Sequence, residues 1–152
     1  MNRKAFTLIE ILVVISVLII LIGVAIPRIR GMQDAGNIAR AKGELQTIQT
    51  AVESYYINQT LKVYPPTTTT IGASFLTGAT PAIISTTPPY DPWGSTTTTE
   101  YNYYRNGGYY IISSVGPDGL GGTETVSSVG VVTGKAVVVN VDDLCVSNGT
   151  GC

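Results

Sequence analysis

Residues 6–26 of the chain read FTLIEILVVISVLIILIGVAI, an apolar run of 21 residues that carries one charge, Glu10. A membrane-spanning helix needs about 20 consecutive apolar residues, so the run predicts such a helix. A carboxylate at the bilayer centre costs roughly 2.5 to 3.5 kcal/mol, and less toward the interface. Glu10 therefore needs either a partner or access to the headgroups.

Two explanations for Glu10 are open. In the first, it lies in the first helical turn, where it reaches the headgroups and the positive end of the helix dipole. In the second, a protease cuts after Ala5, at the end of the short basic head MNRKA, and leaves a new amino group on Phe6. Such a group has a pKa of about 7.7 to 8.0, so it is largely protonated at neutral pH. A buried Glu10 of a neighbouring copy could then neutralise it.

The order Ala5-Phe6-Thr7-Leu8-Ile9-Glu10, followed by the apolar run and Pro27, resembles the amino-terminal signature of type IV pilins and type II secretion pseudopilins. The resemblance implies that a prepilin peptidase cuts between Ala5 and Phe6, and that the amino group of Phe6 is then methylated. It implies that Glu10 guides docking into a filament of identical copies, built by an inner-membrane assembly platform. The family most often has Gly before the cut, where this chain has Ala5.

A secretory signal peptide is the competing interpretation of the same stretch. A basic head, an apolar core and the small residues Gly23-Val24-Ala25 are compatible with a signal-peptidase site. However, the core of a signal peptide usually spans about 7 to 15 residues, and this run is longer and contains a carboxylate. The pilin-like interpretation therefore explains more of the stretch.

The composition excludes several classes of function. Nine basic and ten acidic residues give a net charge of −1, which offers no electrostatic footprint for nucleic acid. The 152-residue chain has no His, so it has no Ser-His or Cys-His nucleophile pair, and it contains no Gly-x-Ser-x-Gly or phosphate-binding loop. We therefore expect a structural protein rather than an enzyme.

The two cysteines, Cys145 and Cys152, lie seven positions apart at the end of the chain. This spacing does not fit a Cys-x2-Cys metal site or the usual redox dithiol. We expect a disulfide that closes the loop CVSNGTGC in a compartment outside the cytoplasm, with two free thiols as the alternative.

A second helical pattern follows Pro27. Apolar residues three or four positions apart predict an amphipathic helix over 27–57. They are Ile29, Met32, Ile38, Ala41, Leu45, Ile48, Val52 and Tyr55. The polar residues Arg40, Lys42, Glu44 and Glu53 are expected on the other face, toward solvent or neighbours.

Gly23 and Pro27 weaken the long helix near its middle, because Pro lacks a backbone donor and Gly is a poor helix former. One interpretation is a tolerated kink at the membrane surface. The resemblance favours the other, a segment that melts when subunits pack.

The remainder predicts a small sheet behind a long connection. Residues 58–100 are rich in Thr and Pro and read as an exposed connection. Two aromatic runs, Tyr101–Tyr104 and Tyr109–Val115, flank Arg105-Asn106-Gly107-Gly108, which predicts a β-hairpin. A third, Val-rich run spans Lys135–Val141. We therefore expect an α+β fold in which the long helix packs on a small antiparallel head formed by residues 101–152.

The head carries a second set of motifs: Asp91-Pro92-Trp93-Gly94, Tyr101-x-Tyr103 and Ser114-x-Gly116-Pro117-Asp118-Gly119. They resemble the head of the major pseudopilin of type II secretion, and Trp93 is expected to anchor the core. In those heads a Gly-Asp-Gly loop can hold calcium, which here implies Asp118 and, as a second ligand, Glu124. Calcium takes about six to eight oxygens, more than these two residues supply. A tight Pro-Asp-Gly turn explains the motif equally well.

These patterns together predict a structural subunit of a helical, type IV pilus-like filament. Its parts are a cleaved leader (1–5), a long helix (6–57), a connection (58–100) and a head (101–152). The precursor is expected in the inner membrane and the product in a surface filament. The alternatives are a type II secretion pseudopilin that forms a periplasmic piston, and a membrane-anchored binding module that does not polymerise. The disulfide-closed end is more like type IV pilins than the major pseudopilin.

Overall fold

The protein is described by a computed structural model over residues 6–67, 71, 76, 83–84, 89–96, 98–117, 119, 124–134 and 144–152. Within these residues one helix precedes all the strands. The elements are α1 Leu8–Asn58, β1 Asn102–Asn106, β2 Tyr109–Ser113, β3 Thr125–Val126, β4 Val132–Thr133 and β5 Cys145–Ser147. This order confirms the predicted α+β fold. The chain divides into two compact units, Met1–Gly36 and Asn37–Cys152.

The first unit contains the apolar part of α1, which is helical across both Gly23 and Pro27. Each large apolar side chain from Phe6 to Ile26 is at least 49 % exposed. The helix is long and apolar enough to cross a membrane. Removing apolar surface from water contributes about 25 cal/mol per Å², so this stretch is stable only in lipid or against other apolar surfaces.

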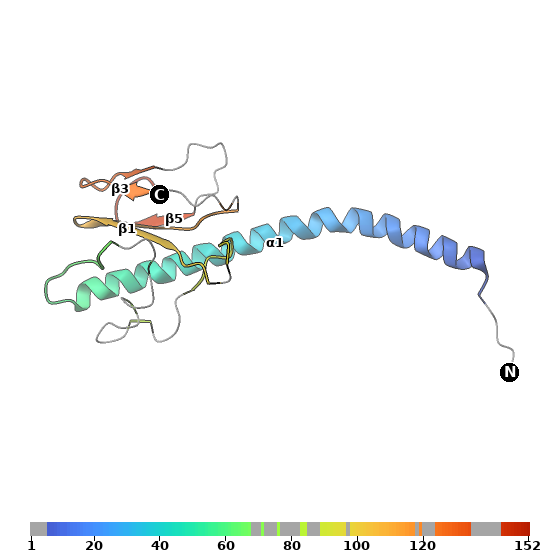
Figure 1. Ribbon diagram of the computed structural model, residues 1–152, viewed down its shortest axis with the longest axis horizontal. Coiled ribbons are helices and arrows are strands. Elements are labelled where there is room, and N and C mark those ends of the chain that lie inside the picture. The colour runs from blue at the N-terminus through green and yellow to red at the C-terminus, as the bar shows by residue number, and fades with distance from the viewer. Residues whose placement is uncertain are drawn as a thin grey trace. The chain divides into compact units, whose positions relative to one another are not determined.

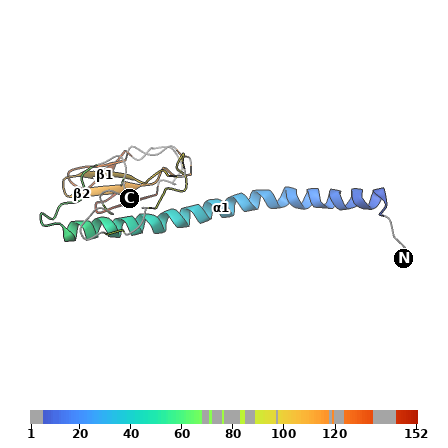
Figure 2. The same cartoon turned by 60° about the horizontal axis from the view of Figure 1, so that its bottom comes forward.

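The second unit, the head, is organised on the amphipathic part of α1. Ala41, Leu45, Ile48 and Val52 recur every three or four residues and are buried, as the predicted apolar stripe requires. In both views the hairpin of β1 and β2 lies along this part of the helix (Figure 1 and Figure 2). Further buried residues of the same core are Ala51, Ile71, Leu76, Tyr101, Tyr103, Tyr110 and Ile112.

The main sheet has the strand order β1-β2-β5, and both pairings are antiparallel. The predicted hairpin is confirmed, but its turn is shorter than the sequence indicated. Asn106 pairs with Tyr109, so Arg105 and Asn106 belong to β1 and only Gly107 and Gly108 form the turn. Gly107 has a φ of 59°, a left-handed conformation that favours glycine.

The third strand is β5, which sequence patterns did not predict as a strand. The Val-rich run Lys135–Val141 lies outside the described residues. A second, two-stranded sheet is formed by β3 and β4, and β3 contacts both β1 and β2. A three-residue strand such as β5 is too short to show an alternating pattern.

The connection 58–100 is not exposed throughout, contrary to the sequence interpretation. Pro65, Ile71 and Leu76 are each less than 2 % exposed, and the last two belong to the core around Ile48. Two strands of five residues cannot cover the apolar stripe of α1 by themselves. Isolated apolar residues from the connection complete the core.

Two acidic residues of α1 face the head rather than solvent or neighbours. The Tyr101 hydroxyl donates a hydrogen bond to Glu44 Oε2 at 2.7 Å. Glu53 accepts one from the Tyr110 hydroxyl at 2.7 Å and another from the Tyr64 hydroxyl at 3.1 Å. A buried tyrosine hydroxyl needs an acceptor, and the helix supplies it. This corrects the expectation that the two glutamates lie on the outer face.

Three buried tyrosines should make the head sensitive to alkali. Burial, the largest cause for each, raises the pKa of Tyr101, Tyr103 and Tyr110 above the ordinary value near 10. Below pH 10 these residues are protonated whether the chain is folded or unfolded. Above it only the unfolded chain releases protons, so stability falls by about 1.4 kcal/mol per pH unit for each such tyrosine.

Thermal unfolding of the chain in detergent, followed by circular dichroism from pH 8 to 11.5, measures this slope. We expect stability to change little up to pH 10 and to fall steeply above it. Tyr103→Phe should reduce the loss of stability above pH 10 by the contribution of one tyrosine, about 1.4 kcal/mol per pH unit. An identical slope in that variant would contradict the assignment.

Candidate functional site

The amino-terminal end of α1 is closed by a reciprocal pair of bonds between Thr7 and Glu10. The Glu10 amide donates to Thr7 Oγ1, while the Thr7 amide and hydroxyl both donate to Glu10 Oε2, each at 3.4 Å. This is a capping box, in which a threonine precedes the helix and a glutamate occupies its third position. The bonds hold the Glu10 carboxylate at the start of the apolar helix.

The role of Thr7 was missed in the sequence interpretation. The signal was present, because Thr7-Leu8-Ile9-Glu10 has the Thr-x-x-Glu spacing of a capping box. Phe6, whose amino group is the predicted docking partner of Glu10, is 78 % exposed. Ala5, the predicted residue before the cut, lies outside the described residues. The structure therefore places Glu10 in the first turn of the helix, and its pairing with the amino group of Phe6 stays a prediction.

The loop Asp91-Pro92-Trp93-Gly94 is organised by a buried carboxylate. Asp91 is 4 % exposed, and its Oδ1 accepts the Trp93 amide at 3.0 Å while its Oδ2 accepts the Val115 amide at 2.8 Å. It thereby joins this loop to the segment after β2. Trp93 is half-buried, so Asp91, rather than Trp93 as predicted, is the inner anchor of the motif.

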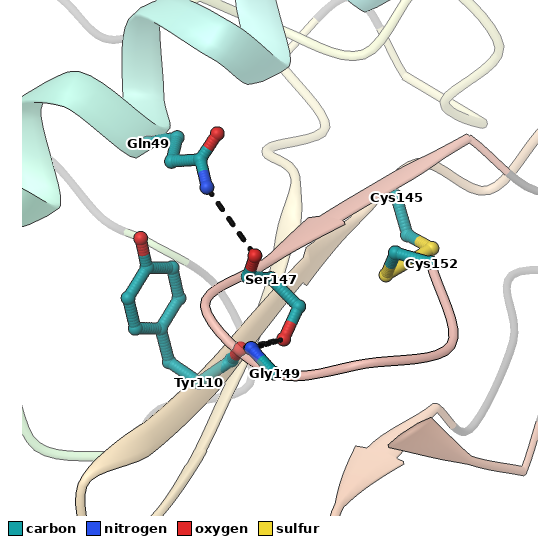
Figure 3. Close-up of a disulfide and its surroundings, with 6 residues drawn as sticks. All are labelled: Gln49, Tyr110, Cys145, Ser147, Gly149 and Cys152. Carbon is teal, nitrogen blue, oxygen red and sulfur yellow. Dashed lines mark hydrogen bonds between the residues drawn. A yellow bond between two sulfur atoms is a disulfide. The ribbon is translucent and has the colours of Figure 1, made fainter. Parts of the chain in front are cut away.

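The last residues of the chain are closed by a disulfide between Cys145 and Cys152, whose Cα atoms lie 5.5 Å apart. Figure 3 shows the loop folded back beside β2. The Ser147 hydroxyl donates to the carbonyl of Tyr110 at 2.6 Å and accepts the Gly149 amide at 2.8 Å. Sequence patterns indicated the pairing but not the role of Ser147.

Comparisons with known families identify this arrangement. A family model described as type II secretion system protein G matches residues 28–131, and that span is more than half of the chain. The chain belongs to the type II secretion system protein G family. A second model, the prokaryotic N-terminal methylation motif, matches residues 1–26. This match supports the pilin-like leader over a secretory signal peptide.

Curated relatives lead to the same family. The type II secretion system core protein G of Pseudomonas aeruginosa is 30 % identical over 141 residues, covering 85 % of this chain and 94 % of that protein. The namesake from Dickeya chrysanthemi is 28 % identical over 133 residues, covering 81 % and 83 % of the two chains. That from Pectobacterium carotovorum is 29 % identical over 137 residues, covering 81 % of each. No solved structure matches the chain significantly.

Family membership settles the broad class of the chain. Protein G and its methylation motif belong to pilin-like structural subunits rather than to an enzyme family. Such subunits are held in the inner membrane by the amino-terminal apolar helix and assemble with copies of themselves after processing by prepilin peptidase. The exposed apolar stretch of α1 fits both environments.

Calcium in the protein G head stays a prediction from the resemblance. Asp118 lies outside the described residues, and Glu124 is 6 % exposed. Among the described residues there is no group of three or more His, Cys, Asp or Glu side chains that could hold a metal. Glu124 therefore belongs to no such group of three within the part of the chain that the structure describes.

Replacing the Asp91 carboxylate should destabilise the protein G head. Asp91→Ala leaves the partly buried Trp93 and Val115 amides without their acceptor, and a fully buried unsatisfied group costs about 1 to 3 kcal/mol. We therefore expect a loss of about 2 to 4 kcal/mol in the free energy of unfolding. Urea unfolding of the chain in detergent, followed by tryptophan fluorescence, measures it.

Asp34→Ala is the matched control for this variant, because Asp34 is an exposed aspartate on α1. A surface substitution of that kind changes stability by less than about 0.5 kcal/mol. Equal stability of the two variants would contradict the role of Asp91.

Proposed function

We propose that the chain is the repeating subunit of a type II secretion pseudopilus, with a structural and no catalytic role. The amino-terminal motif alone does not separate this filament from a surface pilus, because both kinds of subunit share it. The match of the protein G model to residues 28–131 carries the proposal, because most of that span is the head. The relatives compared above are likewise named as core protein G of type II secretion.

The exposed apolar helix provides the surface through which the subunits would pack. Each large apolar side chain from Phe6 to Ile26 is at least 49 % exposed in the isolated chain. Moving them from lipid into a bundle of identical helices exchanges one apolar environment for another, and close packing then selects the neighbour. The heads, residues 37–152, would form the outer surface of the filament.

Charge pairing sets the register in this proposal. Prepilin peptidase would cut between Ala5 and Phe6, and the methylated amino group of Phe6 would meet Glu10 of an adjacent subunit. The capping box with Thr7 supports this, because it keeps the carboxylate at the end of the helix. An unpaired charge buried in the filament core is strongly penalised, so only one stagger between subunits satisfies both groups.

Two further elements belong to the proposal. The segment between Gly23 and Pro27 is helical in the isolated chain and would melt when subunits pack, because Pro27 has no amide to donate and Gly23 has low helix propensity. The assembly platform of the inner membrane would extract the subunit from lipid.

The experiment is an intact mass with amino-terminal sequencing of the protein from native cells, together with a deletion strain. A chain that begins at Phe6 with one added methyl, and a deletion strain that retains its exported enzymes in the periplasm, would support the proposal. Normal secretion with loss of surface filaments would assign the chain to a pilus instead. A chain that begins at Met1 and stays in the membrane would indicate an anchored binding module.

A further inference from the structure

We propose that residues 144–152 form a redox-controlled latch on the head, which we call the terminal latch. Its disulfide joins Cys145 of β5 to Cys152 and, when closed, keeps the last residues beside the main sheet, where Thr150 can bond to the second sheet. When it is reduced, the terminal latch detaches while the core of helix and hairpin stays folded. The latch lies beyond residues 28–131, the span matched by the protein G model, so its behaviour does not follow from that match.

Besides the backbone ladder between β5 and β2, side chains also bond the terminal latch to the main sheet. The side-chain amide of Asn148 makes the two hydrogen bonds that a peptide group of a neighbouring strand would make. Its Oδ1 accepts the Tyr110 amide and its Nδ2 donates to the Gly108 carbonyl, each at 2.9 Å. The Gln49 side chain of α1 donates to the Ser147 carbonyl at 3.4 Å (Figure 3). The ladder that these bonds extend is short, because β5 has only three residues.

The same segment also reaches the second sheet. The Thr150 amide donates to the Gly130 carbonyl at 2.7 Å, and the Val132 amide of β4 donates to the Thr150 carbonyl at 2.9 Å. The approach is close at Gly149, where a Cβ atom would overlap the carbonyl oxygen of Gly130. The terminal latch therefore bridges two sheets that do not share a strand.

The core of the head does not depend on the terminal latch. Among the described residues, the buried members of the core cluster all lie between Leu45 and Ile112. From the latch, Leu144 and Val146 pack on this cluster but are only partly buried. Detachment would thus remove peripheral contacts and leave the tightly packed centre in place.

A reductant can reach the disulfide in the folded protein. Cys145 is half-buried and Cys152 is exposed, and both line a groove of about 280 Å³ together with Lys42 of α1. The positive charge of Lys42 in this groove favours the thiolate that reduction releases. The disulfide is therefore accessible to thiol exchange without prior unfolding.

The chemical step is ordinary thiol–disulfide exchange with a dithiol. A thiolate of the dithiol attacks Sγ of Cys152, the bond between the two protein sulfurs breaks, and Cys145 leaves as a thiolate. The second thiol of the reagent then attacks the mixed disulfide and releases Cys152. The protein gains two electrons and, after protonation, two thiols, while the dithiol becomes a cyclic disulfide.

Amide hydrogen exchange on the processed full chain in detergent, with dithiothreitol as the reductant, tests the proposal. Ser114 and Val115 are adjacent, but the Ser114 amide donates to Leu144 of the latch at 2.9 Å and the Val115 amide donates to Asp91 at 2.8 Å. We expect reduction to raise the exchange rates of Ser114, Tyr110 and Val132 at least tenfold and to leave that of Val115 unchanged.

Other results would overturn the proposal. Unchanged exchange at Ser114 and Val132 would mean that hydrogen bonds hold the segment without the disulfide. Faster exchange at Val115 as well would mean that the whole head depends on the disulfide.

The double variant Cys145→Ser with Cys152→Ser is the control, and its Ser114 amide should exchange rapidly with or without dithiothreitol. A double variant that does not fold would also overturn the proposal of a local latch. Lys42→Gln should slow the reduction at least twofold, and an unchanged rate would remove Lys42 from the proposal.

Discussion

Glu10→Ala is expected to reduce filament yield at least tenfold while leaving the head folded. In the proposed filament the amino group of Phe6 is buried against Glu10 of a neighbour, and removing one partner of a buried ion pair costs about 3 to 5 kcal/mol. Each 1.4 kcal/mol changes an equilibrium about tenfold, so even half of this loss is sufficient. The measurement is the amount of subunit in the sheared filament fraction relative to the total in the cell.

Two further variants separate charge pairing from capping. Glu10→Gln preserves size and hydrogen bonding but removes the charge, so it should assemble almost as poorly as Glu10→Ala. Thr7→Ala removes the hydroxyl that takes part in two of the capping bonds and keeps the carboxylate. Loss of an N-cap costs about 0.5 to 2 kcal/mol, so its defect should be milder. Normal filament yield from Glu10→Ala would exclude the docking role.

Ile48→Ala is expected to have the largest effect on the head. Ile48 is 0 % exposed and belongs to the core cluster. Truncating a buried isoleucine to alanine costs about 2 to 5 kcal/mol, because the cavity that remains is only partly filled by relaxation. Domains of this size have about 5 to 15 kcal/mol in total, so the variant should be close to unfolding at growth temperature.

Thermal unfolding in detergent measures this loss. A domain of the size of the head loses about 4 °C for each kcal/mol, so we expect the melting temperature to fall by about 8 to 20 °C. Ile57→Ala is the matched control, because it removes the same atoms from the same helix at a site that is 64 % exposed. Equal melting temperatures for the two variants would contradict the assignment of the core.

The two sets of variants test different roles of the two units, assembly in one and folding in the other. Glu10 belongs to the unit Met1–Gly36, and its loss is expected to affect assembly without affecting the head. Ile48 belongs to the unit Asn37–Cys152, and its loss acts on folding first. A subunit that must remain folded in the membrane and then pack in a filament benefits from this separation.

Local sequence determined most of the architecture. The apolar run and the periodic stripe after it are sufficient to predict α1 (Leu8–Asn58), because helix formation depends on residues three and four apart. The alternating aromatic runs beside Gly107 and Gly108 predicted the hairpin for a similar reason, since a two-residue turn fixes the pairing of its flanking strands. The capping box and the terminal disulfide are likewise visible as short spacings.

Tertiary structure alone decided what the polar groups of the head do. The sequence predicted Glu44 and Glu53 on the outer face of the helix. In the structure, hydroxyls of tyrosines more than 50 positions away donate hydrogen bonds to both carboxylates. Asp91 was identified only as part of a motif that resembles the pseudopilin head, whereas in the structure it is buried and accepts the Val115 amide from the segment after β2. β5 is a strand because the edge of β2 offers it partners. Contacts of this kind depend on which segments meet after folding, and no local pattern records that.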